Sequence, residues 1–172
     1  SDIVIHDMNT ATMISFALIV IISGIACLSL YYGITTLVPV LVGIMINYIL
    51  MWCLGLNFDI VTIGFSSIAV GCGVDDAIHF LLRLKLRKKL NPTLPYKRLI
   101  NDNIIETGRP IILTTLSVDA GLLMLLFASF KPIKYFGILM CITLTAAMIA
   151  TLIILPPILI GLNYLWNLLK KK

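Results

Sequence analysis

The residues of this chain best suited to chemistry are two aspartates and a histidine inside an apolar run. They lie in the stretch GCGVDDAIHF, residues 71–80, as Asp75, Asp76 and His79. Carboxylates and imidazoles take up and release protons, and they also bind cations. Adjacent helical residues differ in direction by about 100°, so the aspartates face different neighbours while both lie within one turn of His79. The spacing predicts a proton-binding or cation-binding cluster on one helix.

The composition indicates that this helix belongs to a membrane protein. Hydrophobic residues make up 60% of the 172 residues, charged residues make up 12%, and the mean hydropathy is +1.07. These values lie far outside the range of soluble domains, which excludes a soluble enzyme. We expect neither an enzyme nor a nucleic-acid-binding protein.

The membrane setting makes the aspartates informative. An ionised aspartate at the centre of a membrane helix costs about 2.5–3.5 kcal/mol on insertion scales, so such residues are rarely retained without a role. Poor solvation and repulsion between neighbouring carboxylates both favour the protonated form. We therefore expect at least one of Asp75 and Asp76 to bind a proton near neutral pH, which is the property that a proton-coupled protein needs.

Five apolar runs are long enough to cross a hydrocarbon core of about 30 Å, which takes about 20 helical residues. They predict an all-α fold, a polytopic bundle of five transmembrane helices in a single membrane domain, residues 1–172. The chain begins without Met, and we expect it to be a fragment of a longer protein. The predicted helices are 11–32, 36–56, 60–82, 110–129 and 134–160.

The basic residues predict the orientation of these helices. Eleven of the 13 Lys and Arg residues lie in the segment 83–109 or at the C-terminal residues 170–172, and the exceptions are Lys131 and Lys134. Short basic segments stay preferentially in the cytoplasm. We therefore expect an external N-terminus and a cytoplasmic C-terminus.

The segment 83–109 is predicted to be a cytoplasmic, amphipathic connector. It extends the preceding helix, breaks at Asn91 and resumes as a second helical segment. Gly108 and Pro110 are expected to end that segment and to start the next transmembrane helix. A position along the membrane surface and a solvated connector helix are both compatible with the pattern.

Small residues are ordered along the predicted helix 60–82. Ala69, Gly73 and Ala77 recur at every fourth position, and Gly71 stands with Asp75 in a second row. Small residues at this spacing let helix backbones approach closely. We therefore expect this helix to be central in the bundle, with its acidic residues facing other helices rather than lipid.

The fourth predicted helix supplies polar partners. Thr114, Thr115 and Asp119 lie in its interior, and both acidic positions lie about 11–15 Å from the basic ends of their helices. Thr115 and Asp119 share a face, so a polar cluster between the two helices is expected, although threonines often bond to their own helix carbonyls. With no Lys or Arg at that depth, His79, protons or Na⁺ remain to neutralise the carboxylates. The four cysteines lack the spacing of a metal site, so no metal is expected.

Two segments and a proline pair carry a resemblance to a known superfamily. The runs GFSSIAVGCGVDDAIHFLLRLKLRKKL and ETGRPIILTTLSVDAGLLMLLFASFKPIKYFGIL, with prolines at 156 and 157, resemble the membrane part of resistance-nodulation-division (RND) transporters. The chain is most similar to the hydrophobe and lipid exporter (MMPL-like) branch, which shares this pattern with Patched and sterol-sensing domains. The resemblance implies the second to sixth helices of one half of such a transporter.

The resemblance also implies roles for single residues. In this superfamily the acidic residues of the GVDD helix carry the proton relay, which maps onto Asp75 and Asp76. The threonines of the following helix map onto Thr114 and Thr115 as supporting groups. Asp119 departs from the usual pattern and is either an added relay group or a cation ligand.

The function that the resemblance implies is export of hydrophobic or lipid-like molecules, driven by the proton motive force, in a bacterial inner membrane. We expect no cofactor beyond the coupling ion, H⁺ or Na⁺. The expected partners are membrane lipids, the substrate, the other transporter half with its external domains, and further copies of the chain. A non-transporting sterol- or lipid-sensing domain and a structural anchor are the alternatives. The buried acids favour transport, because neither alternative requires titratable groups at this depth.

Overall fold

The computed structural model describes residues 14, 17–25, 30–53, 55 and 60–169. Within these residues the chain is helical and has no strand, which confirms the all-α prediction. Residues 17–25 are helical. The helices that follow are α2 (Leu30–Thr35), α3 (Leu37–Cys53), α4 (Ile60–Leu90), α5 (Tyr96–Leu123), α6 (Lys131–Ile149) and α7 (Leu155–Leu169).

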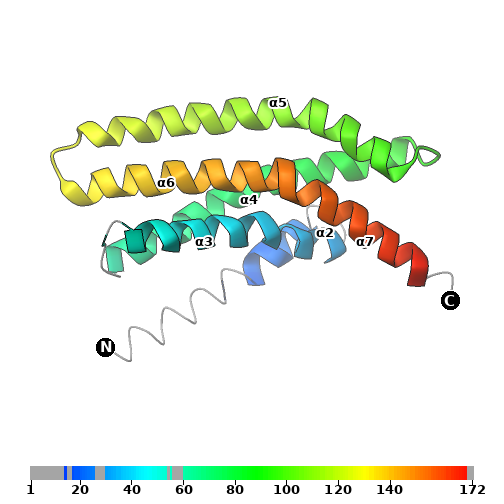
Figure 1. The fold of residues 1–172 in the computed structure, drawn as a ribbon, viewed down its shortest axis with the longest axis horizontal. Helices are drawn as coiled ribbons and strands as arrows, with labels where there is room; N and C mark the ends of the chain where they lie inside the picture. The colour runs from blue at the N-terminus through cyan, green and yellow to red at the C-terminus, as the bar shows by residue number, and fades with distance from the viewer. Residues whose placement is uncertain (1–13, 15–16, 26–29, 54, 56–59, 170–172) are drawn as a thin grey trace.

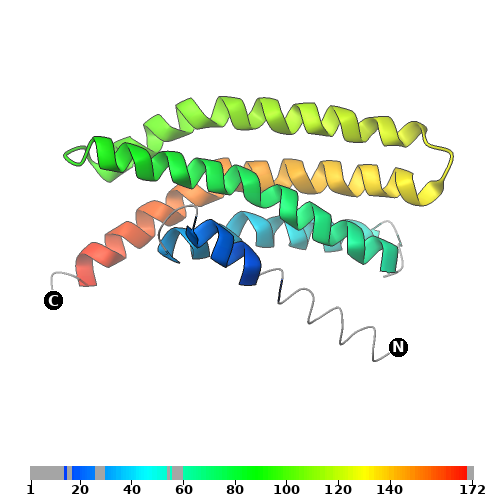
Figure 2. The ribbon, with the colours of Figure 1, turned by 180° about the vertical axis from the view of Figure 1, so that it is seen from behind.

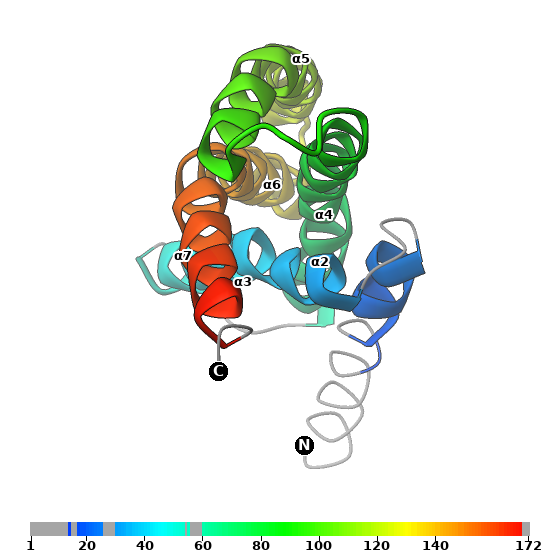
Figure 3. The same cartoon turned by 90° about the vertical axis from the view of Figure 1, so that its right-hand side faces the viewer.

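The consecutive long helices α4, α5 and α6 lie antiparallel to one another along the long axis of the bundle (Figure 1). Helix α6 packs against α3, α4 and α5, and it lies between them in the end-on view of Figure 3. Figure 2 shows α4 from the opposite side, antiparallel to α5. We expected the helix 60–82 to be central, but α6 occupies the middle of the bundle.

Three helical segments have the length and apolar composition needed to cross a membrane: Tyr32–Cys53, Tyr96–Phe127 and Lys131–Tyr164. Large apolar side chains on these segments are exposed, such as Phe127 at 85% and Trp52 at 82%. Such side chains suit contact with lipid rather than with water. A membrane protein is therefore supported, while the count of five spans stays a prediction. Of the expected first helix, 11–32, the structure describes residues 14, 17–25 and 30–32, and the rest lies outside the described residues.

The ends of the helices agree with an alternating topology. The turn at 91–95 and the end of α7 lie at one end of the bundle, and the turn at 128–130 lies at the other (Figure 1). The turn between α4 and α5 and the end of α7 thus lie at the same end of the bundle, and their position on one side of a membrane stays a prediction. Which side is cytoplasmic stays a prediction.

Helix α5 corrects the prediction of a separate connector. Helix α4 ends at Leu90, next to the expected break at Asn91, but α5 continues through Gly108 and Pro110. Pro110 has no N–H group, so one backbone hydrogen bond is lost. A stripe of buried residues at every fourth position holds the helix together on both sides of this gap. Its members are Leu99, Asn103, Thr107, Ile111, Thr115 and Asp119.

The expected fifth helix, 134–160, lies within the continuous helical span Lys131–Tyr164, which contains one irregular turn. A single π-helical turn, Ala150–Ile154, separates α6 from α7. Pro156 and Pro157, the second and third residues of α7, have no N–H groups, so the carbonyls one turn before them lose their usual donors. The N–H group of Leu155 bonds instead to the carbonyl of Ala150, five residues back, which is the π-helical spacing.

The rows of small residues on α4 face in different directions. A Cβ atom placed on Gly73 would lie 3.1 Å from the Cβ atom of Ala147 on α6, and Ala77 is fully buried. A Cβ atom on Gly71 would meet nothing within 4 Å. The side chain of Ala69 lies outside the described part. The row through Gly73 therefore contacts α6, whereas Gly71 lies on the exposed side of α4.

Candidate functional site

Asp76 is the acidic residue of α4 that the fold brings into contact with α5. It is half-buried, and its Oδ2 atom lies 3.2 Å from the hydroxyl oxygen of Thr115. The same hydroxyl lies 2.9 Å from the carbonyl oxygen of Ile111, one turn earlier on α5. A hydroxyl has a single hydrogen to donate and two lone pairs. It therefore donates to one of these oxygens at a time.

Asp75 and His79 lie on a different face of α4. Both side chains are exposed, and they stand one helical turn apart. Within the described part of the chain no helix covers Asp75 and His79, so the expectation that they face other helices stays a prediction. Adjacent positions on one helix point in directions about 100° apart, which explains why Asp76 turns inward and Asp75 does not.

Thr114 does not join the polar cluster. Its side chain is exposed, and its hydroxyl lies 3.1 Å from the carbonyl of Pro110 and 2.9 Å from that of Ile111. Ser117 bonds in the same way to the carbonyl of Leu113 at 2.8 Å. Both hydroxyls thus donate hydrogen bonds to backbone carbonyls of their own helix, which is common for serine and threonine inside helices.

Asp119 contacts α6 rather than α4. It is 6% exposed, and its Oδ2 atom accepts a hydrogen bond from the hydroxyl of Thr145 at 2.7 Å. The other oxygen, Oδ1, is buried and has no hydrogen-bond partner among the described residues. The sequence prediction placed Asp119 in a cluster with the aspartates of α4, and it missed Thr145. The signal was the polar residues in the otherwise apolar run CITLTAAMIAT, 141–151.

A second buried contact on α6 joins it to α3. The side-chain amide of Asn47 donates to the hydroxyl oxygen of Thr143 at 2.9 Å, and that hydroxyl donates to the carbonyl of Leu139 at 2.6 Å. Asn47 is 4% exposed and Thr143 is 2% exposed. Helix α6 therefore carries one threonine toward α3 and another, Thr145, toward α5. The sequence prediction did not include Asn47 or Thr143.

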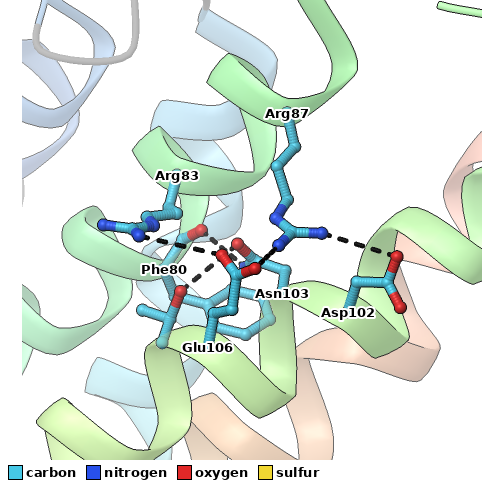
Figure 4. Close-up of polar contacts among 7 residues, drawn as sticks. Phe80, Arg83, Arg87, Asp102, Asn103 and Glu106 are labelled. Atoms are coloured by element: carbon cyan, nitrogen blue, oxygen red, sulfur yellow. Dashed lines mark hydrogen bonds and ion pairs between the residues drawn. The ribbon is translucent and has the colours of Figure 1, made fainter. Parts of the chain in front are cut away.

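A polar clasp joins the ends of α4 and α5 beyond the apolar region (Figure 4). Arg87 pairs with Glu106 and, at 3.5 Å, with Asp102; Arg83 lies 3.7 Å from Glu106. These ion pairs are partly exposed and are therefore screened by solvent. They fix the register of the two helices at this end of the bundle.

Beneath the ion pairs, Asn103 forms the buried part of the clasp. Its amide nitrogen donates to the carbonyl of Phe80 at 3.0 Å, and its Oδ1 atom accepts from the hydroxyl of Thr107 at 3.3 Å (Figure 4). Asn103 and Phe80 are both fully buried. A buried amide without partners is costly, so this network favours a single alignment of α5 against α4.

The acidic residues lie in helical stretches without basic residues. No Lys or Arg occurs in the segments 37–53, 60–82, 110–130 and 135–169. Among the described residues, no three His, Cys, Asp or Glu side chains gather as they do around a metal ion. The carboxyl groups of Asp76 and Asp119 therefore meet threonine hydroxyls instead of a permanent positive charge.

Comparisons with known proteins give two similar relatives. A protein of Methanocaldococcus jannaschii described as a membrane protein is 26% identical over 128 residues, which is 74% of this chain and 32% of that protein. The protein translocase subunit SecDF of Thermus thermophilus is 27% identical over 130 residues, 71% of this chain and 18% of that subunit. The chain thus spans about a third or less of the length of these relatives. No family profile matches the chain, and no solved structure matches it.

These similarities support an RND-like membrane protein. SecDF belongs to the RND superfamily, which agrees with the superfamily that the sequence motifs resemble. Neither relative is named as a lipid exporter, a Patched protein or a sterol-sensing domain. The assignment to the MMPL-like branch therefore stays a prediction.

Proposed function

We propose that this chain is the ion-coupling membrane segment of an RND-like transporter, in which Asp75 and Asp76 take up and release protons. The observation that carries the proposal is the contact of Asp76 with Thr115 between α4 and α5. This contact lies within helical stretches that contain no Lys or Arg. The similarity to a protein translocase subunit adds support for transport.

The Thr115 hydroxyl can serve both protonation states of Asp76. When the carboxylate is ionised, the hydroxyl donates to Oδ2 across 3.2 Å. When Asp76 is protonated, its O–H group donates to the hydroxyl oxygen, and the hydroxyl donates to the Ile111 carbonyl across 2.9 Å. In both states Asp76 keeps its hydrogen bond to Thr115, and the Ile111 carbonyl accepts from that hydroxyl only when Asp76 is protonated, so rotation of one hydroxyl accommodates the proton. Such a pair exchanges protons without separating the helices.

The exposed residues Asp75 and His79 fit the same proposal. They lie on a face of α4 that the described helices do not cover. The chain covers at most 32% of the length of its relatives, so further helices of the whole protein are available to pack there. We place the other half of the transporter on this face. Protons then pass between Asp75, next to that half, and Asp76, next to Thr115.

The proposed substrate is a hydrophobic or lipid-like molecule exported from a bacterial inner membrane, as the resemblance to the MMPL-like branch implies. A second candidate is a protein chain, because the Thermus thermophilus relative is a protein translocase subunit. A lipid-sensing domain without transport is the remaining alternative. A lipid-sensing domain does not require proton exchange at Asp76.

The test uses the full-length protein in lipid vesicles with an imposed pH gradient. Uptake or release of a fluorescent phospholipid and of an unfolded polypeptide is measured side by side. Asp76→Asn should abolish gradient-driven transport, because asparagine keeps the shape of the side chain but cannot titrate. Ser117→Ala is the matched control, since Ser117 bonds only to its own helix in the structure. Gradient-driven transport that persists in the double variant Asp75→Asn, Asp76→Asn would contradict the relay.

A further inference from the structure

We infer that Asp119 and Thr145 form a second cation site of the bundle, at the interface of α5 and α6, which holds one positive charge, a proton or Na⁺, against Oδ1 of Asp119. The role of this site in transport rests on the proposed function. The binding of a cation at the site does not depend on the proposed function, and this binding is measured separately.

The first support is an unmatched atom. Asp119 is 6% exposed, its Oδ2 atom accepts from Thr145 at 2.7 Å, and its Oδ1 atom is buried without a hydrogen-bond partner among the described residues. Buried polar atoms are normally paired, and an exception requires an explanation. A metal cation at Oδ1 would supply the missing partner, whereas a proton there would remove the negative charge of the buried carboxylate.

The second support is the charge balance around Asp119. The segments 110–130 and 135–169 contain no Lys or Arg, so neither α5 nor α6 offers a positive charge at this level. Among the described residues, the Thr145 hydroxyl donates to the Oδ2 atom of this carboxyl group, and the Cys141 thiol of α6 also interacts with the carboxyl group through a weak side-chain hydrogen bond. A thiol is a weak donor, and a hydroxyl carries no net charge. An ionised carboxylate without a cation is therefore poorly compensated here.

The site is also placed next to the proposed relay. Thr115 and Asp119 are consecutive members of the buried stripe of α5, four residues or about 6 Å apart along the helix axis. Thr115 bonds to Asp76 of α4, and Asp119 bonds to Thr145 of α6. A charge that enters at Asp119 is thus felt at Asp76 through a region of low dielectric. Each of the two sites thus joins α5 to a different neighbour, α4 or α6.

The test is infrared difference spectroscopy on the full-length protein in lipid, in the Asp75→Asn, Asp76→Asn background. Spectra are compared between acidic and alkaline pH, and with and without Na⁺. A carboxylic-acid band that titrates with pH and disappears on adding Asp119→Asn identifies a proton. Carboxylate bands that respond to Na⁺ and disappear in the same variant identify Na⁺. Either result supports the site, and bands of Asp119 that respond to neither cation overturn it.

A second measurement covers the case in which Asp119→Asn fails to fold. An apolar carbodiimide, which modifies protonated carboxyl groups in apolar surroundings, is applied to the protein without substitutions, and Asp119 is followed by mass spectrometry. Labelling that decreases at alkaline pH or on addition of Na⁺ supports the site. The absence of labelling under every condition overturns it.

Thr145 is tested as a positioning residue. Thr145→Val should shift the pH or Na⁺ midpoint of the Asp119 bands, and Thr145→Ser should restore it, because only serine keeps the hydroxyl. A purely structural threonine would change the melting temperature without moving this midpoint. If Asp119 binds a cation while transport continues without Asp75 and Asp76, the proposed relay fails and this site stands. If the relay variants stop transport while Asp119 responds to neither cation, the cation site fails and the proposed relay stands.

Discussion

Replacement of Gly73 by larger residues measures how tightly α4 packs on α6. A Cβ atom at this position would lie 3.1 Å from the Cβ atom of Ala147, which is closer than an ordinary van der Waals contact. Alanine gains up to about 1 kcal/mol over glycine from helix propensity, and the tight contact opposes this gain. Leucine adds three further carbon atoms to a filled interface, so Gly73→Leu should cost about 1–3 kcal/mol.

The melting temperature of the helical signal in detergent is the measurement. For a chain of this size, 1 kcal/mol corresponds to about 2–4 °C, so Gly73→Leu should lower the melting temperature by about 2–12 °C. Gly71→Leu is the matched control, because a Cβ atom at Gly71 meets nothing within 4 Å. Ala147→Gly should rescue Gly73→Ala, since it removes the carbon atom that the new methyl group meets. Equal melting temperatures for Gly73→Leu and Gly71→Leu would refute the close contact of α4 with α6.

Three further predictions concern the ends of the helices. Asn103→Leu should lower the stability by about 1–3 kcal/mol, measured by melting, because it removes the buried partner of a backbone carbonyl and of a hydroxyl. Gly137→Ala should also be destabilising, since its Cβ atom would lie 2.8 Å from the carbonyl oxygen of Leu122; an unchanged melting temperature would show that α5 and α6 separate easily. Single cysteines at Asn91 and Ser129 should react with an impermeant reagent from opposite sides of the membrane, and reaction from one side would contradict the topology.

The sequence predicted the apolar helices because their hydropathy is a local property. The runs 36–56 and 110–129 correspond to α3 and to the apolar part of α5. The boundary at Gly108 and Pro110 was wrong because it also rested on local signals. The buried stripe that carries α5 across Pro110 depends on contact with α4 and α6, and sequence spacing alone does not show which neighbour covers a face.

The same limit applies to the candidate site. The matching depths of the acidic residues and Thr115 predicted a contact between α4 and α5, and the structure places Asp76 in that contact. Asp119 shares the face of Thr115, so the sequence favoured a cluster with α4. One turn further along α5, however, that face meets α6, where Thr145 is the partner. The two rows of small residues on α4 likewise have the same spacing in the sequence. Only the fold shows that Gly73 contacts α6 and that Gly71 does not.

The contacts of α5 explain how charge could change at its acidic neighbours without moving the helix. At one end the buried Asn103 and the ion pairs of Arg87 fix α5 against α4. At the other end, Gly137 allows α6 to approach the backbone of α5 closely. Between these fixed ends, Thr115 and Thr145 meet carboxyl groups through hydroxyls, which reverse a hydrogen bond by rotating about a single bond. Under the proposed relay, proton exchange at these sites requires only hydroxyl rotation between aligned helices, and a larger movement of the transporter would involve surfaces outside these contacts, such as the exposed face of α4.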